Sequence, residues 1–208
     1  AAEKASSSKK AKQAPSKVAS VKALEGEYVL TGKSMLTSGY NGVSVTVAAL
    51  GTDSIAITNF WAKGYSSVLK AKVDVATGAI TVPYQVMGQH ETYGDVVFAK
   101  TNLADGSPTA DEAVAGVITA DGLIKLTDAW GAYVKAKPTD TKWAFFSVVY
   151  NTELEKCNAV FTGKKHTGGE IESYGVVFKQ TAENVATIKN LGDYGQTVQI
   201  DLNRNKTA

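Results

Sequence analysis

Three aromatic residues stand close together around a glycine in the first half of the chain. Phe60 and Trp61 are adjacent, and Tyr65 follows Gly64. Because neighbouring residues of a strand face opposite sides, Phe60 and Trp61 cannot both enter one core if strand geometry persists. An exposed aromatic face stacks on a sugar ring or anchors a protein partner, whereas a buried one would close the end of a core. Phe60, Trp61 and Tyr65 are therefore candidate residues for binding a ligand or partner.

The residue types that carry catalysis or hold metals are scattered. His90 and His166 lie far apart in polar stretches, and no helical spacing presents two His side by side. The 20 carboxylates show no preferred pair of the kind that glycoside hydrolysis requires. The single Cys157 has only Lys156 as a cationic neighbour, which favours a buried small hydrophobe over a nucleophile. We expect no catalytic residue, no metal site and no cofactor, hence a protein that is not an enzyme.

The net charge of +2 combines a basic N-terminal stretch with a mildly acidic remainder. Residues 1–22 hold six Lys and one Glu, which leaves −3 on residues 23–208. Nucleic-acid binding calls for basic residues on a folded surface with aromatics between them, and this Ser/Ala/Lys stretch has no aromatics. We expect residues 1–23 to form a flexible basic leader and the chain to bind no nucleic acid. No window reaches the roughly 20 apolar residues of a membrane-spanning helix.

From Leu24 onward the pattern is that of short strands, with hardly any helical spacing. Residues 68–75 alternate between apolar and charged side chains, as in a sheet that is wet on one face. Asp121 and Gly122 predict the clearest hairpin, and Thr77 with Gly78 predicts another tight turn. The expected strands are 27–33, 42–49, 54–60, 67–75, 79–86, 95–100, 113–119 and 123–127. About eight strands favour a closed antiparallel barrel, with a β-sandwich as the alternative.

Two separated motifs recur later in the chain at one constant spacing. The run 29–33 (Val-Leu-Thr-Gly-Lys) returns at 160–164 as Val-Phe-Thr-Gly-Lys. Residues 57–60 return in part at 188–191, and Asn190 follows Asn59 at the same spacing, which we call the repeat spacing. The alternating strand 69–73 matches 198–202 at a slightly shorter spacing, which implies a small deletion. We infer an internal repeat, with a complete β-domain over residues 24–137 and a partial second copy over 138–208.

The second copy ends before the counterpart of residues 79–86 is reached. A partial barrel would have unpaired edges and an open core. We therefore expect the strand 196–202 to need a pairing partner that the second copy does not supply, either from a longer polypeptide, from another chain, or from the first domain. The apolar run 143–150 should pair with one domain or seal the junction.

Residues 55–61, 73–85, 116–124 and 128–133 resemble the secreted calycin-like β-barrel domains of Bacteroidetes surface proteins, which are often lipoproteins. The resemblance implies an antiparallel calycin-like barrel exported to the cell surface or outer membrane of a Gram-negative bacterium, with the periplasm as the alternative. A start at Ala1 without Met fits signal-peptide removal. No N-terminal Cys is present to carry a lipid. Ser54, in Asp53-Ser54-Ile55, matches the short O-glycosylation signal of such bacteria, although it also suits an ordinary turn.

These features favour a non-catalytic interaction protein, either an accessory subunit of a surface complex, such as an outer-membrane nutrient-import complex, or an adhesion-type module. A protein partner is expected, with carbohydrate as a further candidate. The alternative is a barrel that binds a small apolar ligand or a glycan. An interior filled by side chains would exclude the apolar carrier.

Overall fold

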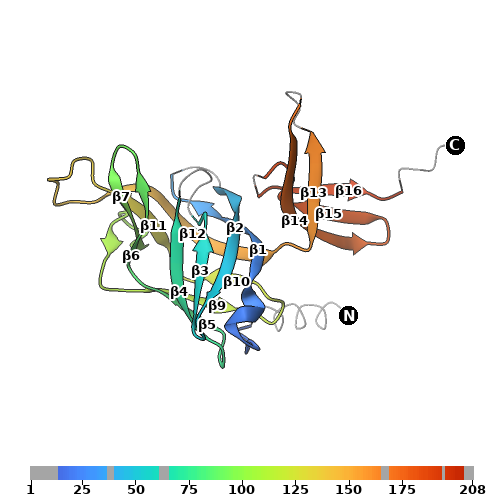
Figure 1. Ribbon diagram of the computed structural model, residues 1–208, viewed down its shortest axis with the longest axis horizontal. Helices are drawn as coiled ribbons and strands as arrows, with labels where there is room; N and C mark the ends of the chain where they lie inside the picture. Colours follow the sequence, from blue (N-terminus) through green and yellow to red (C-terminus); the bar gives the residue numbers. More distant parts are fainter. Residues whose placement is uncertain (1–13, 37–39, 61–65, 165–168, 194, 204–208) are drawn as a thin grey trace.

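The computed structural model describes residues 14–36, 40–60, 66–164, 169–193 and 195–203 (Figure 1). They form one short 3-10 helix, η1 (Val21–Leu24), and sixteen strands. The strands are β1 (Gly26–Ser34), β2 (Tyr40–Leu50), β3 (Ser54–Thr58), β4 (Val68–Asp74), β5 (Ala79–Val82), β6 (Gln85–His90), β7 (Gly94–Thr101), β8 (Pro108–Thr109), β9 (Val114–Ile118), β10 (Ile124–Leu126), β11 (Trp130–Val134), β12 (Ala144–Lys156), β13 (Ala159–Lys164), β14 (Ile171–Ala182), β15 (Val185–Lys189) and β16 (Thr197–Asp201).

Eight strands close an antiparallel barrel in the order β1-β2-β3-β4-β5-β9-β10-β12, and β12 returns to β1. Closure satisfies the backbone hydrogen bonds of every barrel strand, because no edge remains. The all-β class is thus confirmed, and the β-sandwich alternative is wrong because one sheet closes on itself. β11, β7, β6 and β8 extend the sheet beyond the first half of β12.

Apolar side chains fill the barrel interior. β4 shows the predicted alternation, with Leu69, Ala71 and Val73 buried and the charged residues between them exposed. The rings of Phe60, Phe98 and Trp130 pack together, with the Phe60 and Trp130 centroids 4.9 Å apart. Trp130 also donates its indole N–H to the Thr152 hydroxyl at 2.7 Å. The described interior is therefore a packed core, which disfavours a carrier of apolar ligands.

Both predicted tight turns are confirmed. β4 pairs with β5 across Gly78, and β9 pairs with β10 across Gly122, and both glycines have positive φ. The predicted strand 79–86 is two strands instead, β5 and β6, which separate at Pro83. Proline lacks the N–H that a central ladder needs, so the chain leaves the barrel there and β6 pairs with β7.

The N-terminal leader is shorter than the sequence indicated. Ser16 donates its main-chain N–H to Ile118, and Val18 donates to Val75, each at 2.9 Å. The side chains of Val18 and Val21 are buried. A flexible leader over residues 1–23 is therefore wrong for residues 14–23, because this segment buries apolar side chains and pairs with the barrel. Residues 1–13 lie outside the described part of the chain.

β12 belongs to the barrel, so the boundary at residue 137 is too early. Its second half pairs with β10 on one side, and β1 lies along its other side, with Leu30 opposite Leu154. A barrel that ended at residue 137 would lack this closing strand and would leave β1 and β10 each without a neighbour on one side. The barrel therefore runs to Lys156. The apolar run 143–150 was expected to pair with one of the domains or to seal their junction, and it pairs with β11 in the first domain.

A separate four-stranded antiparallel sheet follows in the order β13-β14-β15-β16 and stands beside β1 and β2 (Figure 1). Its pairing repeats that of β1 to β4. Leu30 lies opposite Val43 in the barrel, and Phe161 lies opposite Tyr174 in this sheet, at the repeat spacing on both strands. The pair Val47 and Ile57 likewise corresponds to Phe178 and Ile188. The pairing of β15 with β16 likewise matches that of β3 with β4, if the small deletion that the sequence indicated is allowed for.

β16 is an edge strand within the described residues. β15 pairs along it from Val185 opposite Asp201 to Lys189 opposite Thr197, and no described strand lies on its other side. β4, by contrast, lies between β3 and β5. β13 is the opposite edge of the four-stranded sheet, whereas β1 is covered by β12.

Candidate functional site

The barrel and the four-stranded sheet meet at a buried polar junction. Asn190 is fully buried and donates its amide N–H to the Gly175 carbonyl at 2.9 Å and to the Ser44 hydroxyl at 3.0 Å. Ser44 in turn donates to the Asp193 carboxylate at 2.5 Å. These bonds run from β2 of the barrel to the turn after β15, so they fix the orientation of the two sheets. Buried polar groups that are fully paired in this way rigidify a contact.

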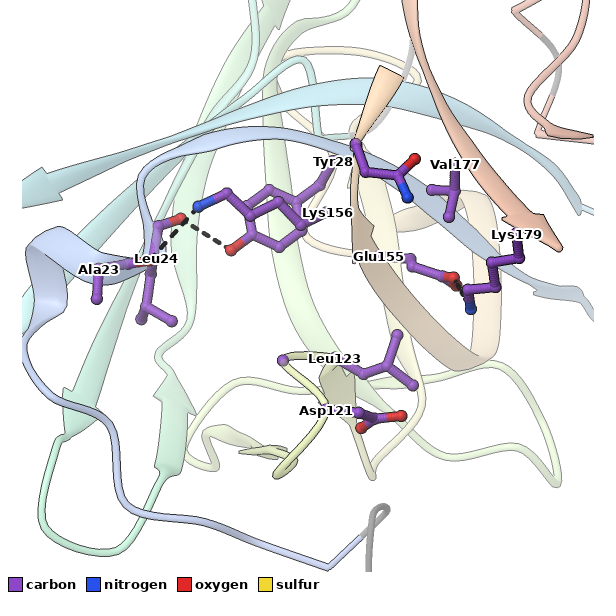
Figure 2. A pocket seen from close by; sticks show the side chains of 11 residues that line it. Ala23, Leu24, Tyr28, Asp121, Leu123, Glu155, Lys156, Val177 and Lys179 are labelled. Atoms are coloured by element: carbon purple, nitrogen blue, oxygen red, sulfur yellow. Dashed lines mark hydrogen bonds and ion pairs between the residues drawn. The ribbon is translucent and has the colours of Figure 1, made fainter. Parts of the chain in front are cut away.

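An open pocket of about 500 Å³ lies beside this junction (Figure 2). Its walls come from the end of η1, the β9–β10 turn, the end of β12, and β14. Lys179 and Lys189 both pair with Glu155, the second at 3.6 Å. Lys179, which lines the pocket from the sheet, is thus paired with a carboxylate from the barrel.

Lys156 and Tyr28 form the other wall of the pocket, as Figure 2 shows. The Tyr28 hydroxyl donates to the Leu24 carbonyl at 2.9 Å, and the Lys156 ammonium lies 6.0 Å from the Tyr28 ring centroid. Burial raises the pKa of Tyr28 to about 12, so its hydroxyl is neutral. The hydrogen bond from Tyr28 to Leu24 holds η1 over the end of β12.

Cys157 sits at the junction as an ordinary thiol. Burial, together with the carboxylates of Glu27, Glu155 and Asp193, raises its pKa to about 11. Because the thiolate is the reactive form, this environment makes Cys157 a poor nucleophile at neutral pH. The described residues contain no group of three His, Cys, Asp or Glu side chains that could hold a metal ion.

The most unusual surface lies on the other side of the four-stranded sheet. In the barrel, the inward positions of β1 to β4 include Leu30, Val43, Val45, Val47, Ile55, Ile57, Leu69, Ala71 and Val73, which lie in the core or pack against it. The corresponding positions of β13 to β16 and the residue after β16 are also apolar or aromatic, and we call them the open face: Phe161, Tyr174, Val176, Phe178, Ala186, Ile188, Val198, Ile200 and Leu202.

Several members of the open face are exposed where their barrel counterparts are buried. Phe161, Phe178 and Val198 are 37%, 39% and 37% exposed. The counterparts Leu30, Val47 and Leu69 are at most 1% exposed. The Phe161 and Tyr174 rings pack against each other across β13 and β14 with centroids 5.5 Å apart. Val176 and Ala186 of the same face are buried, so the exposure is confined to the other members. Several exposed apolar side chains on one face of a sheet mark a candidate interaction site.

A smaller cleft of about 390 Å³ combines aromatic and polar side chains. Tyr93 in the β6–β7 turn and Trp143 before β12 line it, with Lys135 5.0 Å from the Trp143 ring centroid. Asp95 also lines it and accepts a hydrogen bond from Gln89. Aromatic faces beside hydrogen-bonding groups are the chemistry that binds a sugar ring.

Of the three residues predicted from sequence to bind a ligand or partner, the described part of the chain contains only Phe60. Phe60 is wholly buried in the aromatic core, so this candidate binding residue has no exposed face to offer a ligand. Strand β3 ends at Thr58, and Asn59 turns the chain with a φ of 63°, which directs Phe60 inward. Trp61 and Tyr65 lie outside the described residues. Ser54 begins β3, half-buried, and donates its hydroxyl to Asp53 at 2.9 Å; its glycosylation stays a prediction.

The open face had a visible signal in the sequence, namely the alternation of Val198, Ile200 and Leu202. The aromatic cleft had none, because Tyr93 and Trp143 are brought together by the pairing of β7 with β11 and β11 with β12. The junction residues Asn190 and Ser44 were also missed, since a structural polar network has no sequence motif.

The fold and its surfaces define a closed antiparallel β-barrel with an attached open sheet. Comparison of the chain with protein families, with curated proteins and with solved structures finds no match. Within the described part of the chain, no helix is both long and apolar enough to traverse a membrane.

Proposed function

We propose that this chain is a non-catalytic interaction protein that binds a protein partner through the open face of its C-terminal sheet. The observation that carries the proposal is the contrast between the open face and the barrel core. Equivalent strand positions are apolar in both, but Phe161, Phe178 and Val198 remain exposed. Fully burying such a side chain contributes roughly 1.5–3 kcal/mol, so a partner that covers the exposed third of each one gains roughly 0.5–1 kcal/mol per side chain.

The proposal includes the interpretation of β13 to β16 as a partial second copy of the barrel domain. The shared register and the constant repeat spacing support it. A barrel of this type needs eight strands, and the sheet supplies those equivalent to β1 to β4. The partner would then cover the open face where β5, β9, β10 and β12 complete the first barrel.

We further propose that the protein is exported and acts at the cell surface or outer membrane, as an accessory subunit of a surface complex or an adhesion-type module. This part rests on the resemblance of residues 55–61, 73–85, 116–124 and 128–133 to calycin-like barrels. Cell fractionation, combined with protease treatment of intact cells, tests it. Cleavage of the protein in intact cells is the expected result, and full protection in the cytoplasmic fraction contradicts it.

Site-specific photo-crosslinking in the cells that make the protein tests the docking role. A p-benzoylphenylalanine placed at Phe178, on the open face, should form an adduct of higher mass. The matched control is the same photo-reactive residue at Val68, which is 39% exposed on the outside of the barrel, and it should form none. Absence of an adduct at Phe178, or equal adducts at both positions, contradicts the proposal.

A second candidate function is carbohydrate binding in the cleft of Tyr93 and Trp143. The favouring observation is the pair of aromatic rings beside Asp95 and Lys135. Affinity electrophoresis through gels that contain a soluble polysaccharide, such as a β-glucan or a mannan, tests it. Retardation that is lost in Trp143→Ala but kept in Phe178→Ala would support the cleft, and identical mobility in every gel would contradict it.

A further inference from the structure

We propose that the partner of the open face is the same face of a second copy of this chain, so that two four-stranded sheets close one symmetric eight-stranded barrel. The inference rests on the proposed docking function and names its partner. It follows from strand number, strand direction, side-chain pattern and the position of the sheet relative to its own barrel.

The number and direction of the strands allow this closure with every neighbouring pair antiparallel. The four strands are antiparallel in sequence order, so β13 and β16 at the two edges run in opposite directions. A two-fold axis along the barrel axis places β16 of each copy beside β13 of the other, again antiparallel. The closed order β13-β14-β15-β16 repeats twice and contains eight strands, as many as the first barrel. Both contacts of such a two-fold dimer are identical.

In the first barrel, the corresponding edges of β1 and β4 each pair with a neighbouring strand in this geometry. β1, the counterpart of β13, pairs with β12 on the side that is free in β13, with Leu30 opposite Leu154. β4, the counterpart of β16, pairs with β5 on the side that is free in β16. In the dimer, β16 of the second copy takes the place of β12, and β13 of the second copy takes the place of β5. Each edge would otherwise expose a row of unpaired backbone groups.

The side chains that would meet inside are compatible with a dry core. On the side of the sheet that carries the open face, β14 also has the charged Glu172, near its start and at the position of Asn41 in β2, and the polar Gln180, at the position of Ala49. Charged residues of the sheet such as Lys179, Lys189 and Asp201 alternate with the open face and point to the other side. Two copies therefore bring apolar surface against apolar surface, except at Glu172 and Gln180.

The open face is directed away from its own barrel. The opposite side of the sheet, with Val177 and Lys179, lines the pocket shared with Leu123 and Glu155 of the barrel, as Figure 2 shows. Because successive strand residues face opposite sides, Val176 and Phe178 point outward from that contact. A second copy can thus approach without displacing the junction around Asn190.

The area is sufficient for association. Four strands spaced about 4.8 Å apart, with five residues of about 3.4 Å each, span roughly 19 by 17 Å. The flat area of the two faces together is roughly 650 Å². Protruding side chains and the two new strand pairings raise the accessible surface that the dimer buries to the order of 1,000 Å², where specific interfaces begin.

Sedimentation velocity and native mass spectrometry of the full chain test the inference, with concentrations from about 1 to 100 μM because dimerisation obeys mass action. The expected species has twice the 21.9 kDa mass of the chain. Val198→Asp, on the open face, should be monomeric at concentrations where the wild type is dimeric. Val68→Asp is the matched control, a valine of similar exposure on the outside of β4, and should remain dimeric.

Hydrogen exchange separates barrel closure from a looser dimer. Amides of both edge strands, β13 and β16, should exchange slowly in the wild-type dimer and rapidly in Val198→Asp, while β1 to β5 exchange equally in both and so report that the barrel is folded. A wild-type monomer over the whole concentration range, or a dimer that Val198→Asp leaves intact, overturns the inference. A monomer that still forms the Phe178 photo-adduct with a different protein overturns self-association but keeps the docking function, whereas a monomer with no adduct overturns both.

Discussion

Asn59 and Asn190, which correspond to each other in the repeat, take the same left-handed backbone conformation, with φ of 63° and 79°. Each ends a strand, and each donates its main-chain N–H across the following turn, Asn59 to Ser67 at 2.9 Å and Asn190 to Gln196 at 2.6 Å. Asparagine tolerates this conformation better than most residues. The two differ in their side chains, since Asn190 is fully buried between the sheets and Asn59 is partly exposed.

This difference predicts unequal effects of one substitution. Glycine keeps the left-handed backbone at both positions, so Asn59→Gly should change the free energy of unfolding by only a few tenths of a kcal/mol. Asn190→Gly removes the amide that pairs with Gly175 and Ser44 and should destabilise the sheet by about 1–3 kcal/mol. Hydrogen exchange of β14 to β16, followed residue by residue, checks the prediction. Equal exchange rates in the two variants would contradict it.

The absence of a side chain at Gly175 allows the sheet to approach the barrel closely. A Cβ at this position would lie 2.7 Å from both the Cys157 sulfur and a Glu27 carboxylate oxygen. Gly175→Val should therefore push β14 away from β1 and cost about 1–3 kcal/mol, while the barrel itself stays folded. Limited proteolysis between β12 and β13 should become faster. The control is Gly88→Ala, whose Cβ would meet its nearest neighbour at an ordinary 3.4 Å and should leave the cleavage rate unchanged.

Because Phe60 packs in the aromatic core, its replacement by alanine should strongly lower the free energy of unfolding. Phe60→Ala leaves a cavity beside Phe98 and Trp130 and should cost about 3–5 kcal/mol. Val86→Ala, at a side chain that is 50% exposed on β6, should cost less than about 0.5 kcal/mol. Chemical denaturation followed by tryptophan fluorescence measures both. A loss below about 1 kcal/mol for Phe60→Ala would show that the cavity had collapsed at little cost.

Local patterns in the sequence predicted much of the barrel. Alternation in β4 and glycine at positions 78 and 122 specify strands and turns through residues that are close along the chain. β12 was missed as a barrel strand and β11 as its neighbour, because residues 130–134 and 144–150 are largely apolar on both faces and lack alternation. Trp130 to Val134 are all buried, since β7 and β12 flank them. Such runs reveal burial but not which strand lies beside them.

The candidate sites were less accessible to sequence reasoning, for physical reasons. The sequence predicted that Phe60 and Trp61 face opposite sides of a strand that runs to residue 60, but β3 ends at Thr58 and Asn59 takes a left-handed conformation. The repeat predicted which residues of the two segments correspond, and the pairing of β13 to β16 follows that correspondence. It could not show which side of that sheet faces the barrel, since this depends on long-range contacts such as Ser44 with Asp193.

The last prediction concerns alkaline pH. Burial, followed by the carboxylates of Glu27, Glu155 and Asp193, raises the pKa of Cys157 from 9.0 to about 11, and burial raises that of Tyr28 from 10.0 to about 12. The folded state therefore holds both protons more tightly than the unfolded chain. By linkage, the resulting stability is fully present below about pH 9 and is lost as the pH rises through 9–11 for Cys157 and 10–12 for Tyr28.

Two measurements check this prediction with different readouts. The rate at which iodoacetamide alkylates Cys157 should rise with an inflection near pH 11 in the folded chain and near pH 9 in denaturant. Cys157→Ala should flatten the fall in the free energy of unfolding between pH 9 and 11, while Tyr28→Phe should act on the window between pH 10 and 12. An alkylation inflection at the same pH in folded and unfolded chains would mean that the junction neither buries the thiol nor places carboxylates beside it, and the sheet would then not dock on the barrel as described.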